Sequence, residues 1–568
     1  MKVISTVTTI NLDLSPQEVA YIQGDCDYLC YLDSSLCPNK YSQFSYISWN
    51  PKFVLKSFGY ENEFINISRN IKYFSYQHPL SFLKQHVGNY TGKIGNRRSE
   101  DLKVIYINRD KLRIISKKSK DKLPDFKGGF VGYFSYDLKN FIEILPQTVF
   151  DDINIPLFYL AFYDRLFSYD HNKSKWYFIR NYLIKTKGRS DRSFYKNYNS
   201  INADSDYFEA EGYDINFSED DYVDNNVSEE NLLERVNLEW EKINKMLLEK
   251  YNRRFFKFKN KLSSKKNGDK VKQHIIKKYS KKEVASIRLR SNFTKKNYLK
   301  AVSKAKEYIH NGDIYQMSMT QRFHCKLPVE PIDLYYILRE KNAAPFSAFL
   351  NFPEVKIGSS SPERFLFLKG DIIETRPIKG TRPRGKNELE DEKYIVELKN
   401  SIKDRAELNM IVDLERNDLG KFCNYGSVEV SEHAVIEKYA KVFHSVSTVV
   451  GKVRKKFDIA DILKATFPGG SITGAPKIRA MQIIDELEST ARTVYTGSIG
   501  YIGIDNTMDI NIVIRTFIIK EDNFYYNVGG GIVEDSVPEE EFQETLDKGL
   551  ALQETLRFFE SRNLKKLL

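Results

Sequence analysis

Short apolar stretches alternate with polar turns through the first third of the chain. Residues 103–107, 128–138 and 158–169 are examples, and turn signals such as Asn50-Pro51 and Gly128-Gly129 separate such stretches. Short apolar stretches bounded by turn residues such as Gly, Pro and Asn are typical of β-strands. We therefore predict a strand-rich N-terminal region over residues 1–185.

The pattern changes to a helical repeat after residue 290. Residues 298–310 have apolar positions at helical spacing and are followed by Asn311-Gly312, a typical helix end. Residues 348–352 and 365–370 have the character of strands, whereas residues 392–420 predict one long amphipathic helix that stops at Gly420. We expect residues 291–568 to form a mixed helix-and-strand region that holds the chemistry.

Residues 186–290 form a charged segment of low sequence complexity. Residues 201–240 contain 13 acidic residues against Arg235 alone, and residues 241–300 contain 21 Lys and Arg against 4 acidic residues. Such runs predict a solvated insertion with one helix candidate at residues 229–251. The alternative is an arm that binds a polyanion through residues 261–282.

Composition restricts the function classes further. The net charge of +12 arises mostly from the segment at 241–300, so it does not indicate a nucleic-acid-binding surface through the fold. The five cysteines, Cys26, Cys30, Cys37, Cys325 and Cys423, include no CxxC pair. No stretch approaches roughly 18 apolar residues, and the N-terminus lacks a signal-peptide core. We expect a soluble cytoplasmic protein with reduced thiols and no membrane partner.

Two acidic pairs are candidates for a metal site. Asp404 and Glu407 are three residues apart, as are Glu541 and Glu544. Side chains at this spacing share a face of a helix, and such a pair is most often solvated surface. If the two pairs faced each other, their carboxylates would suit Mg²⁺, which keeps water or substrate oxygens beside a few protein ligands.

Three further motifs have competing interpretations. The glycine-rich residues 466–477 permit close approach of an anion, with charge from Lys477, but they do not form a Walker A motif. His444 is either a structural histidine or an active-site group, and Arg515 binds either a buried carboxylate or a substrate carboxylate. Lys379, in the stretch ETRPIKGT, is either a surface lysine or a functional cation.

The ordered motifs resemble those of the chorismate-utilising enzymes. They are SSSPERFL, ETRPIKGTRPRG, KDRAELNMIVDLERNDLG, HSVSTVVG, PGGSITGAPKIRAM, YTGSIGY, DINIVIRT and GGGIVEDSVPEEEFQET. The resemblance covers residues 293–568 strongly and extends weakly to residues 128–138. It implies an α+β fold, in which helices surround two stacked, largely antiparallel β-sheets and the two halves of the chain are intertwined.

The resemblance also implies roles for particular residues. Glu407 and Glu544 match Mg²⁺ ligands, with Asp404 and Glu541 as outer acids, and His444 matches an active-site histidine. The remaining matches are substrate contacts: Tyr495, Arg515, Gly380, Thr381, Gly529, Gly530 and Gly531. A dianionic substrate explains why a cation, an arginine and glycine-rich backbone are needed together.

Two positions distinguish members of this family. Gln316 stands where the water-adding members have a lysine, and Lys379 stands where anthranilate synthases usually have alanine. Lysine at the second position resembles the aminodeoxychorismate synthases, transferases that act on chorismate. The resemblance implies that Lys379 is a covalent nucleophile and that Glu363 is the general acid.

The expected partners follow from that assignment. The chain has no glutaminase signature around its cysteines and no lyase region, so we expect ammonia from a separate glutamine amidotransferase and a separate downstream lyase. Two alternatives stay open: an anthranilate synthase component I, and a non-catalytic scaffold whose basic segment binds polyanions.

Overall fold

The structure, a computed structural model, describes most of the chain. The described residues are 2–36, 41–91, 102–108, 113–115, 122–185, 221–224, 227–255, 269–280, 287–439, 442–560 and 564. The predictions for Cys37 and for residues 186–220, 256–268 and 281–286 lie outside this set. Cys26, Cys30, Cys325 and Cys423 are free thiols, as predicted.

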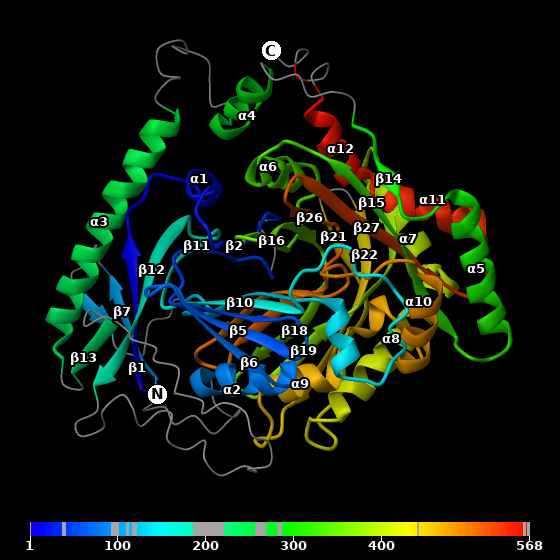
Figure 1. Ribbon diagram of the computed structural model, residues 1–568, viewed down its shortest axis with the longest axis horizontal. Coiled ribbons are helices and arrows are strands. Elements are labelled where there is room, and N and C mark those ends of the chain that lie inside the picture. Colours follow the sequence, from blue (N-terminus) through cyan, green and yellow to red (C-terminus); the bar gives the residue numbers. More distant parts are fainter. Residues whose placement is uncertain are drawn as a thin grey trace.

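The larger of two β-sheets combines strands from both halves of the chain (Figure 1). In spatial order its strands are β14 (Arg290–Ser291), β15 (Gln316–Lys326), β27 (Asn523–Ile532), β26 (Thr516–Lys520), β17 (Lys356–Ser361), β16 (Phe346–Asn351), β2 (Leu29–Asp33), β3 (Phe44–Ser48), β11 (Arg165–Asp170), β12 (Lys175–Lys185), β1 (Val3–Ile10), β7 (Leu102–Asn108) and β8 (Arg113–Ile115). Two short strands, β13 (Tyr222–Asp224) and β23 (Gly474–Ala475), pair with β12 and β15. The halves join where β2 pairs with β16, with Leu32 opposite Ala348.

The second sheet is built in the same way. Its order is β20 (Ile378–Pro383), β22 (Val442–Lys452), β19 (Ile372–Arg376), β18 (Arg364–Lys369), β25 (Met508–Asn511), β24 (Ser498–Gly503), β9 (Gly129–Phe134), β10 (Phe158–Tyr163), β4 (Phe53–Ser57), β5 (Glu61–Asn66) and β6 (Ile71–Tyr76), and β21 (Glu429–Lys438) pairs with β22. Its halves join between β9 and β24, with Gly132 opposite Gly500. Among the described strands, only β1 with β7 and β12 with β13 pair in parallel.

The two sheets stack on a shared core. Val131 and Tyr159 of the second sheet pack in one apolar cluster with Ile179, Ala348 and Ile518 of the larger sheet. Burial of each side chain of this size stabilises the fold by about 1.5–3 kcal/mol. The α+β fold with intertwined halves is therefore confirmed, and so is the strand-rich character of residues 1–185.

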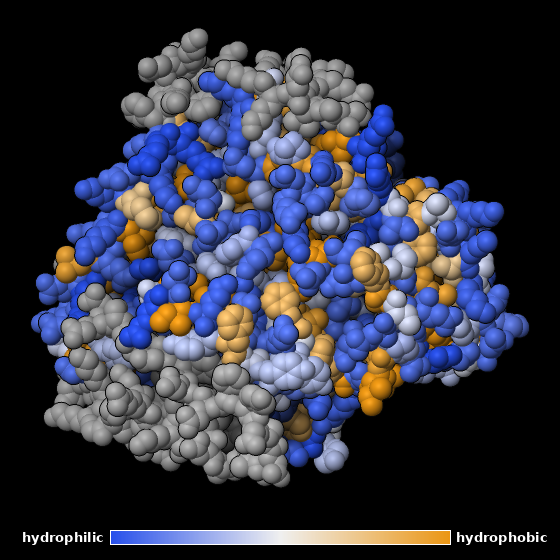
Figure 2. Space-filling model, in the orientation of Figure 1, coloured by the Kyte–Doolittle hydropathy of each residue, from blue (hydrophilic) through white to orange (hydrophobic). Residues whose placement is uncertain are grey.

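Helices cover the outer faces. They are α1 (Pro16–Ile22), α2 (Pro79–Thr91), α3 (Glu229–Phe255), α4 (Lys270–Ser280), α5 (Lys295–His310), α6 (Pro331–Lys341), α7 (Glu388–Asn400), α8 (Ile402–Gly420), α9 (Ile459–Thr466), α10 (Lys477–Leu487), α11 (Pro538–Lys548) and α12 (Leu550–Phe558). No helix within the described ranges is long and apolar enough to cross a membrane. The face seen in Figure 2 is largely hydrophilic, with hydrophobic residues in small separate groups.

Two helix predictions are confirmed and one is corrected. Helix α5 ends where predicted, with Asn311 as its C-cap and Gly312 at φ +81°. Gly420 ends α8, but the single long helix predicted for residues 392–420 is wrong. The chain breaks at Ser401, whose extended backbone ends α7 and whose hydroxyl accepts a hydrogen bond from the Asp404 N–H to begin α8.

The charged segment is ordered where the structure describes it. Helix α3 contains the predicted helix and runs along the β1–β12 end of the larger sheet (Figure 1). Its Trp240 packs against Phe167 and Phe178. In α4, Val271, Ile275 and Tyr279 are buried, so the expectation of a solvated insertion does not hold for these two helices. Each of these two helices packs through an apolar face, although its exposed face is highly charged.

Candidate active site

Lys379 lies on β20, inside the molecule rather than on its surface. Its side chain is 15% exposed, and its Nζ lies 4.0 Å from Glu407 Oε2. Burial lowers the pKa of Lys379; Glu407 opposes this effect and Lys548 adds to it, so the pKa stays below its ordinary value. The surface-lysine interpretation is therefore wrong, because this amine is held in a partly desolvated position where its neutral form is favoured.

Glu363 lies between β17 and β18 and faces the same lysine. The residue is 5% exposed, and Ser471 and the backbone of Ile378 are close enough to favour its charged form. Burial raises the pKa of Glu363 to about 7, although Ser471 and Lys379 both oppose this. A carboxyl group with this pKa can hold a proton near neutrality and can give it up during a reaction.

The two acidic pairs converge from α8 and α11. Glu407 and Glu544 are close enough to oppose each other's ionisation: burial raises the pKa of Glu407, and the charge of Glu544 contributes. Burial also raises the pKa of Glu544, but Lys548, whose Nζ lies 2.5 Å from Glu544 Oε1, outweighs it and leaves this pKa below its ordinary value. The charge of Glu544 on α11 thus reaches Glu407 on α8.

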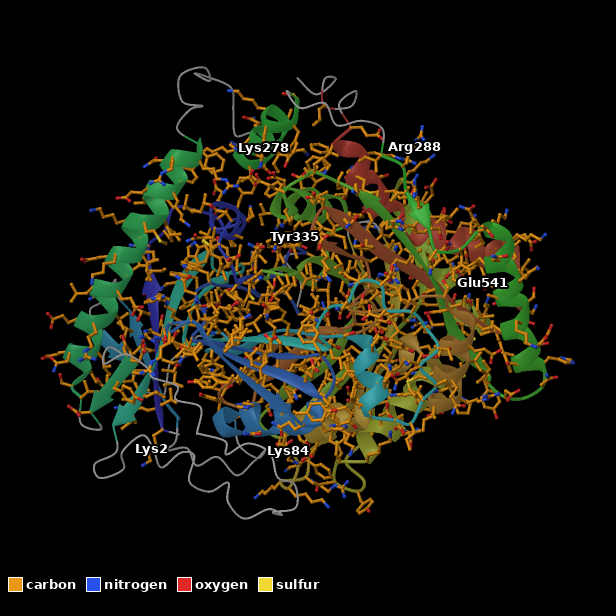
Figure 3. All side chains as sticks on the ribbon, viewed as in Figure 1. Lys2, Lys84, Lys278, Arg288, Tyr335 and Glu541 are labelled. Atoms are coloured by element: carbon orange, nitrogen blue, oxygen red, sulfur yellow. The ribbon has the colours of Figure 1, made fainter. Side chains whose placement is uncertain are left out.

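The outer acids have different surroundings. Asp404 forms an ion pair with Arg382 at 3.1 Å. Glu541 accepts a hydrogen bond from Ser536 through Oε1, while its buried Oε2 has no partner among the described residues. Figure 3 shows Glu541 on the side of the molecule formed by α5 and α11.

The donor set fits Mg²⁺ without forming a complete protein cage. No group of three or more His, Cys, Asp and Glu side chains in the described ranges could hold a metal ion by itself. Mg²⁺ commonly uses one or two carboxylates with water and substrate oxygens, and Glu407 and Glu544 would supply these two. The unpaired Oε2 of Glu541 is an additional acceptor for a metal-bound water. Mg²⁺ binding itself stays a prediction.

Glycines of β27 form the floor of the site. Gly529, Gly530 and Gly531 pair with Thr320, Met319 and Ser318 of β15. A Cβ at Gly531 would lie 2.5 Å from Gln316 Nε2 and 3.6 Å from Lys379 Nζ, and one at Gly530 would lie 3.0 Å from Glu541 Oε2. Side chains at these positions would therefore fill the space between Lys379, Gln316 and the acids.

Gln316 begins β15 beside this floor. The side chain is 3% exposed, and its Oε1 is buried without a hydrogen-bond partner among the described residues. Gly380 follows Lys379 at φ +79°, where a Cβ would meet Leu398 and Asp404 within 3.0 Å. The bend next to Lys379 thus requires glycine.

Arg515, Tyr495 and His444 form a second group at the site. Burial raises the pKa of Tyr495 to about 12, although the positive charge of Arg515 opposes this rise. Burial lowers the pKa of His444 to about 4, and the charge of Arg515 lowers it further. His444 is therefore neutral at physiological pH, and its Nδ1 lies 2.8 Å from Thr381 Oγ1. The Tyr495 hydroxyl and the neutral His444 ring are therefore uncharged hydrogen-bonding groups beside the Arg515 cation.

Arg515 is left without an anionic partner. It lies in the break between β25 and β26 at φ +54°. Its guanidinium donates to the carbonyl of Lys548, and no carboxylate in the described ranges forms an ion pair with it. The salt-bridge interpretation finds no support, and an incoming carboxylate would satisfy this cation.

Lys548 and Ser471 belong to the site but were not predicted from the sequence, whereas Lys477 was predicted to contribute and does not. Lys548 binds Glu544 and the Gly529 carbonyl at 3.0 Å, and Ser471 lowers the pKa of Glu363. Ser471 belongs to a motif recognised in the sequence and Lys548 follows one by three residues, but spacing alone did not show where either side chain points. Lys477, predicted to charge the glycine-rich loop, instead binds Asp418 and the carbonyls of Thr466 and Pro468.

A separate cavity of about 280 Å³ is lined by Asp33, Tyr46, Arg364 and Asp509, among others. Asp33 is already bound by Arg339 and by the hydroxyls of Tyr31 and Tyr335, the last of which is labelled in Figure 3.

Residues 81–554 match the family model described as chorismate binding enzyme. The chain belongs to the chorismate binding enzyme family. The protein is thus a chorismate-binding enzyme, as the motifs predicted.

Individual relatives carry different names. Aminodeoxychorismate synthase component 1 of Bacillus subtilis (strain 168) is 35% identical over 449 residues, which cover 79% of this chain and 81% of that protein. Anthranilate synthase component 1 of Acetivibrio thermocellus is 32% identical over 531 residues, covering 93% and 90%. The crystal structure of anthranilate synthase component I from Streptococcus pneumoniae TIGR4 is similar with a TM-score of 0.61 and 26% identity, covering 90% of this chain and 92% of that one. Relatives of this chain therefore include both aminodeoxychorismate synthases and anthranilate synthases.

Proposed function

We propose that this protein is an aminodeoxychorismate synthase component 1, which converts chorismate and ammonia to 4-amino-4-deoxychorismate. The observation that carries the proposal is the position of Lys379, an amine of lowered pKa facing the proton-holding Glu363. The similarity to the Bacillus subtilis protein of that name supports it.

The first half of the reaction uses Lys379 and Glu363. The neutral amine of Lys379 attacks C2 of chorismate, both ring double bonds shift by one position, and the C4–O bond breaks. Glu363 gives its proton to the leaving hydroxyl, which departs as water. The adduct nitrogen then loses a proton to the Glu363 carboxylate, so that Lys379 is joined to the ring as a secondary amine.

The second half restores the enzyme. Ammonia attacks C4, both double bonds shift back, and the C2–N bond to Lys379 breaks. Glu363 gives its proton to the departing amine, and its carboxylate then accepts one from the new C4 ammonium. The unpaired Oε1 of Gln316 is an acceptor that would orient an N–H of ammonia.

Substrate anchoring uses the remaining groups. Arg515 and Tyr495 would bind the enolpyruvyl carboxylate, while Gly529–Gly531 and Thr381 would contact the ring and its substituents. When bound to Glu407 and Glu544, Mg²⁺ would neutralise the ring carboxylate. These roles explain why Arg515 lacks a carboxylate partner of its own.

Nitrogen supply involves a second protein in this proposal. We infer that a separate glutamine amidotransferase delivers ammonia and that a separate lyase consumes the product in 4-aminobenzoate and folate biosynthesis. Ammonium salts should replace the amidotransferase in vitro.

The direct test is an assay with chorismate, Mg²⁺ and ammonium, with the product separated before and after addition of a 4-amino-4-deoxychorismate lyase. The proposal predicts a product that yields 4-aminobenzoate only after the lyase is added. Formation of anthranilate without the lyase would reject the proposed specificity.

Anthranilate synthesis is the second candidate, because relatives of that name match nearly the whole chain. In that reaction ammonia would attack C2 directly, and Lys379 would have no covalent role. The product of the assay therefore separates the two candidates.

A further inference from the structure

The buried ion pair of Arg492 and Glu488 has no part in the reaction described above. The two residues are 2% and 5% exposed. The guanidinium donates through Nε to Glu488 Oε2 at 2.9 Å and through Nη2 to Glu488 Oε1 at 2.6 Å. A buried ion pair often stabilises a fold no better than apolar side chains of similar size, so the other contacts of this pair need an explanation.

The guanidinium also reaches three other segments of the chain. Nη1 donates to the Ile472 carbonyl at 3.0 Å and to Thr496 Oγ1 at 3.4 Å, and Nη2 donates to the Ser318 carbonyl at 2.8 Å. With the two contacts to Glu488, the five N–H groups of the arginine have five acceptors. These acceptors lie in the glycine-rich loop, on β15 and in the turn around Tyr495, so one side chain joins three segments.

Strand β15 is held by both members of the ion pair. The Ser318 carbonyl accepts from the guanidinium, and the Thr320 N–H donates to Glu488 Oε1 at 3.0 Å. Ser318 lies two residues after Gln316 and pairs with Gly531 of the substrate floor. The ion pair therefore fixes the strand that carries Gln316.

The glycine-rich loop is attached at the same place. The Ile472 carbonyl accepts from Arg492, and the next carbonyl, that of Thr473, accepts from the Ser318 N–H at 2.7 Å. The loop and β15 therefore cannot separate here without breaking both hydrogen bonds.

Tyr495 lies in a turn of unusual backbone conformation. Its N–H donates to the Arg492 carbonyl at 3.1 Å. Thr493 and Thr496 have φ values of +53° and +61°, which β-branched residues rarely adopt. Such a conformation persists where surrounding contacts hold it, and the guanidinium supplies one of these contacts through Thr496.

The same turn is joined to the segment before Arg515. The Thr496 N–H donates to the Val513 carbonyl at 2.7 Å, and the Val513 N–H donates to the Gly497 carbonyl at 2.9 Å. Val513 lies two residues before Arg515. The position of the turn therefore affects both Tyr495 and Arg515.

We propose that Arg492 is a positioning residue for the reaction: with Glu488, it holds the turn that carries Tyr495 in a fixed place relative to β15, which carries Gln316. The inference rests on the proposed function, in which Tyr495 binds the enolpyruvyl carboxylate and Gln316 orients ammonia. The two substrates are thus held by different segments and must meet in one geometry. A displacement of about 1 Å between such segments is enough to impair a reaction.

The test uses Arg492→Lys, which keeps the positive charge but lacks the planar fork that reaches Glu488 and the three other segments together. Steady-state kinetics should show that the KM for chorismate and the KM for ammonium both rise, each by about tenfold. Two reference variants separate these effects. Tyr495→Phe should raise the KM for chorismate alone, and Gln316→Met should raise the KM for ammonium alone.

A role in stability alone would give a different result. Partial unfolding lowers the amount of active enzyme, so the apparent kcat would fall while both KM values stayed unchanged. The KM values refer to the folded enzyme, so they can be measured even when part of the protein is unfolded. Unchanged KM values in Arg492→Lys, or a rise in only one of them, would overturn the inference.

The double variant Glu488→Leu/Arg492→Met removes both buried charges together. Its urea unfolding midpoint, followed by circular dichroism, should lie closer to that of the wild type than the midpoint of Arg492→Met alone. Both KM values should nevertheless stay raised, because apolar side chains cannot hold the three segments. Wild-type KM values in the double variant would also overturn the inference.

Arg416→Met is the matched control. Arg416 forms an ion pair at 2.8 Å with Asp413 on the same helix, but both side chains are exposed. This variant should keep both KM values of the wild type.

The experiment also separates the inference from the proposed function. Rates are recorded as chorismate consumption, so both KM values can be obtained whether the product is 4-amino-4-deoxychorismate or anthranilate. If the enzyme consumed no chorismate, the proposed function would fail. Calorimetric titration with chorismate would then still show whether Arg492→Lys weakens binding as Tyr495→Phe does, and unchanged binding would overturn the role of Arg492.

Discussion

Two buried charged clusters in this protein are arranged in opposite ways. Arg180, on β12, binds three carboxylates: Asp164, Asp221 at 2.6 Å and Glu239 at 3.1 Å. Lys379, on β20, has its nearest carboxylate at 4.0 Å. The pKa of Arg180 is raised because these carboxylates outweigh burial, whereas that of Lys379 is lowered because burial dominates.

The difference shows what each cluster can do. Arg180, on β12, joins α3, Asp164 between β10 and β11, and the segment around Asp221, and its charge is fixed by close partners. Burial lowers the pKa of Lys379, which favours its role as a nucleophile. Close pairing stabilises the fold, and incomplete pairing leaves groups free to react with an anionic substrate.

The largest effect is expected from Lys379→Ala. Loss of the nucleophile should reduce 4-amino-4-deoxychorismate formation at least about a thousandfold, or shift the product toward C2 amination. Product chromatography over a long incubation measures this change. Lys386→Ala, at an exposed position nearby, is the control, and wild-type rates in Lys379→Ala would refute the covalent role.

Replacing Arg180 by methionine should act on stability instead. The change removes the guanidinium that Asp164, Asp221 and Glu239 share and leaves Lys52 as the remaining cation beside the two aspartates, which should lower the free energy of unfolding by about 3–5 kcal/mol. Lys379→Ala should lower it far less. Denaturant unfolding followed by circular dichroism compares the two variants, and equal losses would contradict the distinction between the clusters.

Glu363→Gln should reduce kcat by about 10²–10⁴-fold because it removes the proton donor. The wild-type profile should contain a pKa near 7 that this variant lacks, since burial raises the pKa of Glu363 to about 7. Only protonated Glu363 can donate the proton, and this form disappears as the pH rises through that value, so kcat should fall with rising pH. An unchanged profile in Glu363→Gln would assign the proton to another group.

Gly531→Ala should have the smallest effect, about a tenfold weaker binding of chorismate, because the new methyl group would occupy space next to Gln316 and Lys379. Titration calorimetry measures the affinity. Gly88→Ala on α2 is the matched control, since a Cβ there meets no atom within 4 Å. Equal affinity in the two variants would show that β27 does not form the substrate floor.

Much of this arrangement was predictable from local patterns. The spacing of Asp404 with Glu407 and of Glu541 with Glu544 predicted shared helix faces, and Asn311-Gly312 predicted the end of α5. The motifs identified the family and, through it, the stacked sheets. These features depend on residues close in sequence or on motifs recognised as a set.

Other features depend on contacts between distant residues and could not be predicted. Ser401 breaks the helix because its hydroxyl caps α8, and Lys477 is bound by Asp418 and two carbonyls. Helices α3 and α4 pack through a few apolar side chains within a highly charged segment. The hydrogen bond from the Gly470 N–H to Glu415 joins residues 55 positions apart, so local patterns could not predict it.

The covalent role of Lys379 is tested most directly by mass spectrometry of the enzyme after incubation with chorismate and Mg²⁺ but without ammonia. A peptide containing Lys379 should gain the mass of chorismate less one water, and added ammonium should remove this adduct at the rate of turnover. An unmodified Lys379 in an enzyme that still makes 4-amino-4-deoxychorismate when ammonium is added would contradict the account.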